Sequence, residues 1–437
     1  MKRESMPVSS VALYVPRSTL GVLSGLLLAA AVLLVAWSLV VPIFEAPDEP
    51  AHWEYARYLH DEHRLPAFGQ LVEANYPPLF FLLVAPVAAR SALPARSASA
   101  DGRTMPFPPR FFRNAADDFT RYWPLREARL ISALLSVLTV LFCYLAGREA
   151  TGRVETGLLV GGVVAFLPQF TFRGMNISDD VLVTLMAAMT TYLLVRMLRR
   201  GFIWPVALAA AAAMAGALLA KISAGFLPVP FVLAILSERA SWRARLVRLT
   251  ALGLSLALIA PWVIRNVILY ADLFATREVL AVIPDQIERR PPTSPYFVTA
   301  FPLHLTKSFI GDFGWQNLGL PYWMYGLFIG LMVAASWGVW RYFRQSGATA
   351  RLTLVVLTIP LLNLAVVVYV NLTLTNWQGR YLFPALPAIA LLAGLGLECL
   401  PRWSARLAML TVTGLALLNV AILGLVVYPA YWPPPPV

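Results

Sequence analysis

Long apolar runs, separated by short polar stretches, recur along the whole chain. Each run has about 20 residues, the length that a helix needs to cross the hydrocarbon core of a bilayer. We expect eleven spanning helices, at about residues 20–42, 130–147, 156–172, 179–196, 203–220, 222–237, 248–268, 321–340, 352–370, 381–397 and 407–427. Two long polar connections, residues 43–129 and 271–320, interrupt the pattern. It predicts an all-α, polytopic integral membrane protein with one membrane domain, residues 1–437.

The composition supports this class of protein. The chain is 59% hydrophobic and 13% charged, whereas soluble domains have about 45–50% apolar and about 25% charged residues. The first run, from about Leu20 to Val41, is too long for a signal peptide and lacks a small-residue cleavage site, so we expect a retained helix. Cys143 and Cys399 lie in or beside apolar runs, and two cysteines exclude a disulfide framework.

The net charge of +12 is unevenly distributed. If the N-terminus is cytoplasmic, the basic excess falls in the short loops on that side, and the two long connections are nearly balanced. This is the positive-inside pattern of a plasma-membrane protein, and it argues against nucleic acid as a partner. The apolar segment Pro77 to Ala89 is short for a span. We expect an interfacial helix there that leaves on the side it entered, because a crossing would turn Arg199 and Arg200 outward.

Ionisable and aromatic residues gather in the first outer connection, in EAPDEPAHWEY, Glu45 to Tyr55. A helix from about Pro50 to Asp61 places Asp48, His52 and Tyr55 on one face. A carboxylate here can act as the general base of a group transfer. Asp48 and Glu49 both fit that spacing. The alternative is that Asp48 only caps the helix and that Glu49 and His52 are solvated.

Three cations, Lys221, Arg265 and Arg380, lie at the outer ends of apolar helices, where the positive-inside pattern does not explain them. Such residues are costly in a membrane and need an anion. The anion is either a phosphate group or an acid of the chain, and the candidates are Asp48, Glu49, Asp179 and Asp180. The alternatives are snorkelling of the cations and, for the two aspartates that open a helix, a simple helix-dipole contact.

Several other signals bear on the chemistry. FIGDFGW, Phe309 to Trp315, is either a lid or sugar platform in the second outer connection or a plain interfacial turn. The sequence has no P-loop, zinc-protease motif, nucleophile elbow or Cys/His metal spacing. Without a nucleotide-binding signature, a sugar nucleotide is not the expected donor.

PDEPAH, YPPLFFLL, GALLAKISAGFLPVP, PWVIRN and QGRYLFP occur in an order that resembles the GT-C superfamily. These are polyprenyl-phosphate-dependent glycosyltransferases, such as the protein O-mannosyltransferases and the lipid A aminoarabinose transferase. The chain looks like a bacterial branch of this superfamily. The resemblance covers almost the full length.

The resemblance implies a lipid-phosphate-sugar-dependent hexosyl or pentosyl transferase. It would transfer the sugar with inversion, on the extracytoplasmic face, to an acceptor that the sequence does not identify. Asp48 or Glu49 would be the base, and Lys221, Arg380 and Arg265 would bind the donor phosphate. The expected acceptor- or sugar-binding residues are His52, Tyr55, Tyr76, Asp179, Asp180, Trp315 and Gln378.

Relatives differ in their need for a divalent metal, and the first connection lacks a DxD motif, so no cofactor is assigned. Two other functions fit a membrane protein of this kind. One is a transporter or flippase of lipid-linked sugars, which would favour an internal repeat or ionisable groups at mid-membrane. The other is a non-catalytic subunit of a cell-envelope assembly complex.

Overall fold

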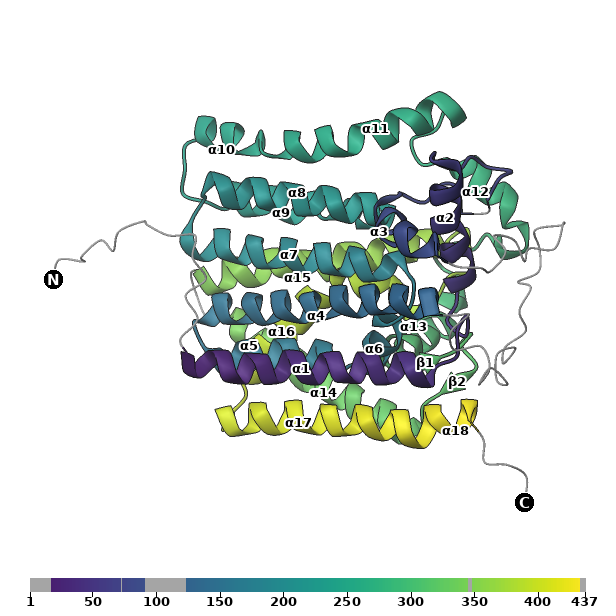
Figure 1. The fold of residues 1–437 in the computed structure, drawn as a ribbon. Coiled ribbons are helices and arrows are strands. Elements are labelled where there is room, and N and C mark those ends of the chain that lie inside the picture. The colour runs from purple at the N-terminus through teal and green to yellow at the C-terminus, as the bar shows by residue number, and fades with distance from the viewer. Residues whose placement is uncertain (1–16, 72, 91–122, 345–347, 433–437) are drawn as a thin grey trace, which may run out of the picture.

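The structure is a computed structural model that describes residues 17–71, 73–90, 123–344 and 348–432. The helices lie side by side in one bundle (Figure 1). Eight helical segments of the described chain are long and apolar enough to cross a membrane. They are α1 (Arg17–Val40), α4 (Trp123–Thr151), α7 (Asp179–Arg200), α10 with α11 (Trp242–Leu249, Leu252–Tyr270), α14 (Tyr322–Phe343), α15 (Ala348–Asn371), η4 with α16 (Gly379–Ala385, Leu386–Glu398), and α17 with η5 and α18 (Ala405–Ile422, Leu423–Val427, Tyr428–Tyr431).

The remaining apolar segments are bent or short. Helices α5 (Val154–Ala165) and α6 (Pro168–Gly174) meet at 67° and make a ninth span if they are counted together. Helix α8 (Trp204–Ala220) and the pair η1 (Ile222–Phe226) and α9 (Pro228–Leu236) flank Lys221. All eleven predicted segments coincide with helices. Eleven full spans are not confirmed, because the two arms beside Lys221 are short of the about 20 residues that a span needs.

The first long connection contains α2 (Glu49–Glu62) and α3 (Leu79–Ala88), both at the end of the bundle where α4 begins (Figure 1). Arg129 in α4 donates to the carbonyl oxygens of Val41 and Pro42, so the end of α1 also lies there. Helix α3 does not cross the bundle, as expected. The predicted limit at residue 129 is wrong, since α4 begins at Trp123. The charged residues in the first turns of α4 are tolerated because Arg129 is paired with Glu49.

The second long connection is more structured than a polar loop. It contains α12 (Thr276–Val282), η2 (Pro284–Gln286), η3 (Pro295–Val298), α13 (Ala300–Ile310) and a hairpin of β1 (Asp312–Phe313) and β2 (Leu318–Gly319). Helix α13 packs against η4. A Cβ atom at Gly379 would lie 2.2 Å from the backbone nitrogen of Phe309, so this close approach requires glycine. The contact fixes the start of η4 and hence the position of Arg380.

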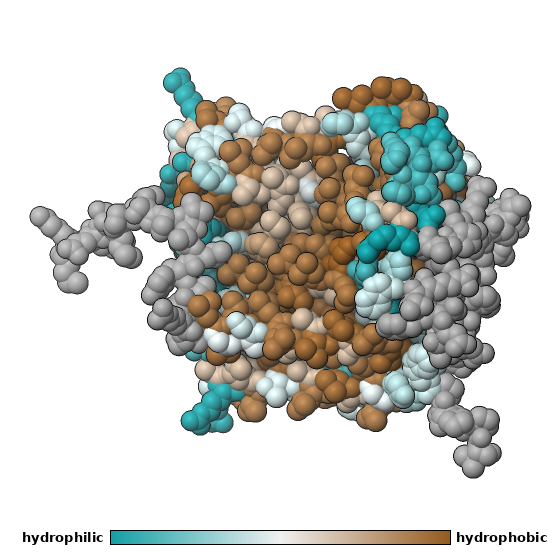
Figure 2. Space-filling view, in the orientation of Figure 1, coloured by the Kyte–Doolittle hydropathy of each residue, from teal (hydrophilic) through white to brown (hydrophobic). Residues whose placement is uncertain are grey.

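Figure 2 shows apolar side chains over the middle of one face of the molecule, with hydrophilic side chains towards its ends and most densely around α2. This is the distribution expected where lipid covers the middle of the bundle. The hydrophilic end at α2 is the end at which both long connections meet.

Candidate active site

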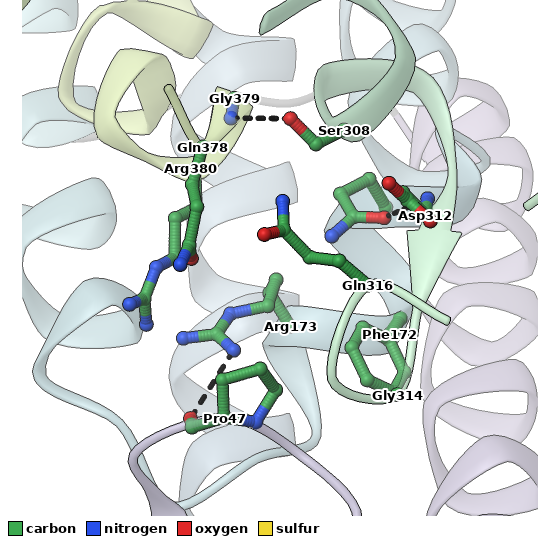
Figure 3. Close-up of a pocket in the computed structure, with 11 residues that line it drawn as sticks. Pro47, Phe172, Arg173, Ser308, Asp312, Gly314, Gln316, Gln378, Gly379 and Arg380 are labelled. Carbon is green, nitrogen blue, oxygen red and sulfur yellow. Dashed lines mark hydrogen bonds between the residues drawn. The ribbon is translucent and has the colours of Figure 1, made fainter. Parts of the chain in front are cut away.

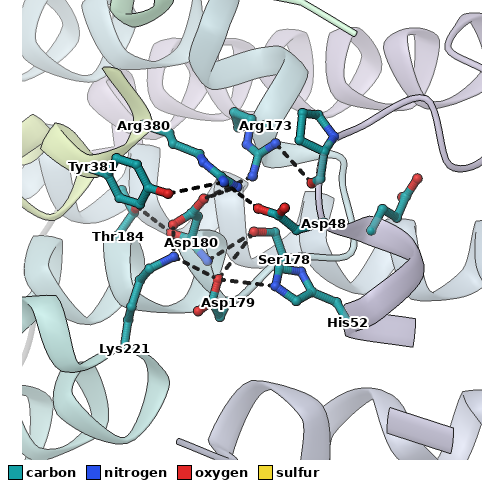
Figure 4. A network of polar contacts seen from close by, with 12 residues as sticks. Asp48, His52, Arg173, Ser178, Asp179, Asp180, Thr184, Lys221, Arg380 and Tyr381 are labelled. Carbon is teal, nitrogen blue, oxygen red and sulfur yellow. Dashed lines mark hydrogen bonds and ion pairs between the residues drawn. The ribbon is translucent and has the colours of Figure 1, made fainter. Parts of the chain in front are cut away.

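An ion pair between Asp48 and Arg380 lies at the end of the bundle that carries α2 and α13 (Figure 4). Asp48 immediately precedes α2, and Arg380 is in η4, more than 300 residues further along the chain. The guanidinium of Arg380 also lies 3.5 Å from Oδ2 of Asp180, which opens α7. The fold therefore brings predicted site residues from three distant segments into one contact network.

Asp180 is the centre of that network. Its Oδ1 lies 2.6 Å from Nζ of Lys221, and its Oδ2 lies 3.0 Å from Nη2 of Arg173. Lys221 also lies 3.1 Å from Oδ1 of Asp179. Of the anions considered for Lys221 and Arg380, three of the four acids of the chain lie beside them, the exception being Glu49. Cations that are held by buried carboxylates are not snorkelling to headgroups.

Asp48 has an unusual backbone. Its φ of 69° lies in the left-handed region, which costs free energy in a non-glycine residue and is often found at functional sites. Asp48 occupies the N-cap position of α2, but its side chain makes no capping hydrogen bond, so the capping alternative is wrong. Burial alone would raise the pKa of this carboxyl, but the positive charges beside it, of which Arg380 and Arg173 are permanent, lower it to about 2. Asp48 is therefore ionised at neutral pH.

Glu49 is directed elsewhere. Its two carboxylate oxygens each lie 2.7 Å from a nitrogen of Arg129, and both side chains are completely buried. The same carboxylate accepts hydrogen bonds from the backbone amides of Phe44 at 2.9 Å and Ile177 at 3.2 Å. With four donors around it, Glu49 has little capacity left for a substrate. The geometry thus separates two acids that fit the sequence spacing equally well.

Predicted residues of the first connection do come together. Nδ1 of His52 lies 2.8 Å from the carbonyl oxygen of Ile177, and its Nε2 lies 3.9 Å from Oδ1 of Asp179. Tyr55 donates to the carbonyl oxygen of Tyr76 at 3.0 Å. Burial lowers the pKa of His52 and raises that of Tyr76. His52 is therefore a buried group at the edge of the ion-pair network.

Two ionisable residues of this site, Arg173 and Glu73, are not among the predicted site residues. Arg173 lies in the bent helix α6, where the apolar pattern alone predicts the end of a span. Glu73 lies in an irregular stretch before Tyr76, and its Oε2 is 3.5 Å from Nε2 of His52. Burial and the carboxylates of Asp48 and Asp179 raise the pKa of Glu73 well above its usual value. In the sequence, the only signal for Glu73 is that it is an isolated acid close to YPPLF.

A polar pocket adjoins Arg380 on the side of α13 (Figure 3). Side-chain amides, a hydroxyl, a carboxylate and two guanidinium groups contribute to its lining. The lining residues are Pro47, Gln169, Phe172, Arg173, Ser308, Asp312, Gly314, Gln316, Gln378, Gly379 and Arg380. Gln378, a predicted acceptor- or sugar-binding residue, is among them.

Two predicted residues lie outside these groups. Trp315 does not line the pocket, and its indole donates to the carbonyl oxygen of Phe44 at 3.3 Å, which connects the second long connection to the first. Arg265 donates to the carbonyl oxygen of Pro66 and contacts the side chain of Asn266 at 3.2 Å. Neither contact points to a role in the ion-pair network.

Some members of the superfamily that the sequence resembles need a divalent metal. Among the residues that the structure describes, no group of three or more His, Cys, Asp or Glu side chains is placed to hold a metal ion. Asp179 and Asp180, which are adjacent, are already held by Lys221. As they stand, these residues do not fit a metal site.

Comparisons with known proteins agree with the architecture. The sequence profile of the dolichyl-phosphate-mannose-protein mannosyltransferase family matches residues 124–264, less than half of the chain. No curated protein sequence matches the chain. Two solved structures are similar in fold. ArnT from Cupriavidus metallidurans bound to undecaprenyl phosphate has 18% identity and a TM-score of 0.54, and the same protein in the apo state has 17% identity and a TM-score of 0.55.

Each comparison with ArnT covers 92% of this chain and 63% of the ArnT chain. The chain thus spans less than two thirds of the length of the proteins it resembles. At this identity the likeness shows the fold. The fold is that of the GT-C membrane glycosyltransferases, as the resemblance in sequence implied.

Proposed function

We propose that the chain transfers a sugar from a polyprenyl-phosphate-linked donor to an acceptor, with inversion, on the extracytoplasmic face of the plasma membrane. One observation carries the proposal. Asp48, an ionised carboxylate, is paired with Arg380 in the same network as Lys221. A group that accepts a proton and groups that bind phosphate are thus next to one another, on a fold used for lipid-linked sugar transfer.

In this proposal Lys221 and Arg380 bind the donor phosphate, lysine as a point charge and arginine as a fork of donors. An incoming phosphate competes with Asp48 for the guanidinium of Arg380. Loss of that ion pair returns the pKa of Asp48 towards its ordinary value, because the nearby positive charge that lowered it is neutralised. Donor binding therefore makes Asp48 a stronger base at the time it is needed.

The chemical step is a single displacement. The acceptor hydroxyl or amine attacks the anomeric carbon, and Asp48 takes its proton. The bond from that carbon to the phosphate oxygen breaks, and the lipid phosphate leaves with the electron pair. Lys221 and Arg380 stabilise the charge that develops on the leaving group. One attack from the face opposite the phosphate inverts the anomeric configuration.

Other residues would position substrates. Gln378 and the pocket beside Arg380 offer amide groups for sugar hydroxyls. His52, Tyr55 and Tyr76 would shape the side of the cluster that α2 and the first connection form. We assign a structural role to Glu49, because its carboxylate is paired with Arg129. The side of the membrane follows from the positive-inside pattern.

The test is a transfer assay with the purified protein in liposomes. Radiolabelled polyprenyl-phosphate sugars and a membrane extract are supplied to the wild type, Asp48→Asn and Lys221→Ala. Transfer of label to a new product by the wild type, and its loss in both variants, is the expected result. Label that changes leaflet but stays on the same lipid, equally in all three proteins, would overturn the proposal in favour of a flippase.

A further inference from the structure

The imidazole of His52 lies between a backbone carbonyl and two carboxylates. Nδ1 is 2.8 Å from the carbonyl oxygen of Ile177. A carbonyl only accepts hydrogen bonds, so Nδ1 carries a proton and donates it. Nε2 lies 3.5 Å from Oε2 of Glu73 and 3.9 Å from Oδ1 of Asp179. In the neutral ring the lone pair of Nε2 therefore faces two acids.

Of these two acids, Asp179 has another hydrogen-bond donor beside it. Oδ1 of Asp179 accepts from Nζ of Lys221 at 3.1 Å. Within the described part of the chain, His52 is the only basic side chain within 4.0 Å of the Glu73 carboxylate, and Oε2 of Glu73 is buried without a hydrogen-bond partner. A lone pair and a buried carboxylate oxygen repel one another at this distance unless a proton lies between them.

The charges of the cluster lead to the same conclusion. Its permanent cations are Arg173, Lys221 and Arg380, whereas its acids are Asp48, Glu73, Asp179 and Asp180. With all four acids ionised and His52 neutral, the cluster carries one uncompensated negative charge. One additional proton makes it neutral. A buried uncompensated charge is costly, so the protonated form is favoured.

We propose that Glu73 is a positioning residue whose carboxyl keeps one proton and donates a hydrogen bond to Nε2 of His52. The cluster is then neutral enough for an anionic lipid phosphate to bind Lys221 and Arg380. The identity of that ligand rests on the proposed function. The opposite shifts in the pKa values of the two partners, up for Glu73 and down for His52, agree with a proton on the carboxyl.

Proton binding at Glu73 is coupled to every charge that faces it. The facing groups come from α2 and the residue before it, from the first connection, and from the starts of α7, η1 and η4. They are Asp48, His52, Tyr55, Tyr76, Asp179, Lys221 and Arg380. A bound phosphate adds one more negative charge beside them. Phosphate binding therefore raises the affinity of Glu73 for its proton, and loss of the proton weakens phosphate binding by the same factor.

The experiment measures binding of a polyprenyl methyl phosphate to the full chain in lipid nanodiscs as the pH is raised. This phosphodiester carries one fixed charge and has no sugar to transfer. For the wild type, Kd should be constant at low pH and rise by up to about tenfold per pH unit once Glu73 ionises. Glu73→Gln keeps a donor for Nε2 and is permanently neutral. At every pH, this variant should bind the phosphodiester as tightly as the wild type binds it at low pH.

Glu62→Gln is the matched control, because Glu62 is an exposed acid at the end of α2; it should follow the wild type. A pH-independent Kd for the wild type would overturn the inference. So would markedly weaker binding by Glu73→Gln at all pH values, since that would require an ionised Glu73.

A second measurement needs no ligand. The infrared spectrum of the wild type should contain the carbonyl stretch of a protonated carboxyl that is absent from Glu73→Gln. If the band is absent from the wild type, the inference fails whatever the protein binds. If the band is present and the phosphodiester does not bind at any pH, the proton on Glu73 stands, and both its role in donor binding and the proposed function fail.

Discussion

Arg129 and Glu49 form a completely buried, two-pronged ion pair, with Nε and Nη2 each 2.7 Å from a carboxylate oxygen. The same guanidinium donates to the carbonyl oxygens of Val41 and Pro42, which follow α1. The same carboxylate accepts from the backbone amide of Ile177, just before α7. One pair thus connects four segments that surround Asp48. Its role is to hold the site together.

Removal of one partner should destabilise the protein. Breaking a buried pair leaves an uncompensated charge and typically costs about 3–5 kcal/mol. We expect Arg129→Met to lower the unfolding temperature strongly in detergent, and Arg153→Met, at an exposed position on the opposite end of the bundle, to leave it unchanged. A Glu49→Gln protein that folds as stably as the wild type but transfers no sugar would contradict this assignment and make Glu49 the base.

Asp48→Asn should have the opposite pattern. The amide keeps the shape of the side chain but cannot accept the acceptor's proton, and general-base catalysis typically contributes about 10²–10⁴ in rate. We expect a loss of that size in the liposome transfer assay, with the protein still folded. Asp61→Asn, at an exposed position on the same helix, is the control and should be fully active. Retained activity in Asp48→Asn would remove Asp48 from the mechanism.

Lys221→Ala should weaken binding of the polyprenyl methyl phosphate. A charge-assisted hydrogen bond contributes about 1.5–3 kcal/mol, so we expect Kd to rise at least about tenfold. Lys307→Ala is the matched control, since Lys307 is a lysine of α13 outside the network. Unchanged binding in Lys221→Ala would show that the lysine only neutralises Asp179 and Asp180.

The ion pair of Asp48 should also appear in acid stability. The folded-state pKa is lowered from 3.8 to about 2, so the pair contributes stability above pH 3.8 that is lost as the pH falls towards 2. The contribution is at most about 2 kcal/mol, because the side chain of Asp48 is 24% exposed and water screens the pair. Unfolding measured between pH 2 and pH 5 should show a difference between the wild type and Asp48→Asn that shrinks with acid.

Much of this fold could be predicted from the sequence because a bilayer imposes one length and one composition on every span. The start of α4 could not, because Arg126 and Arg129 make its first turns look like a loop until the buried partner Glu49 is known. The apolar pattern also gives no indication of the 67° bend that brings Arg173 to Asp180.

The candidate site shows the same division. Lys221 and Arg380 could be selected because a cation at the outer end of an apolar helix needs an anion. The choice between Asp48 and Glu49 could not be made, since adjacent residues share the same local pattern and differ only in tertiary contacts. Glu73 was missed for a related reason: an isolated acid in an irregular segment is informative only when its burial is known.

Gly379→Ala should test whether the backbone positions Arg380. A Cβ atom there would lie 2.2 Å from the backbone nitrogen of Phe309, so η4 must move away from α13, and the hydrogen bond from the Gly379 amide to Ser308 Oγ, now 2.8 Å, must lengthen. A shift of about 1 Å in a catalytic group can cost about 10² in rate. We therefore expect a large loss in the rate of sugar transfer with only a small fall in the unfolding temperature. Gly330→Ala is the control, because a Cβ atom there, on α14, meets nothing within 4 Å. Equal activity of the two variants would mean that Arg380 reaches its partners without this contact.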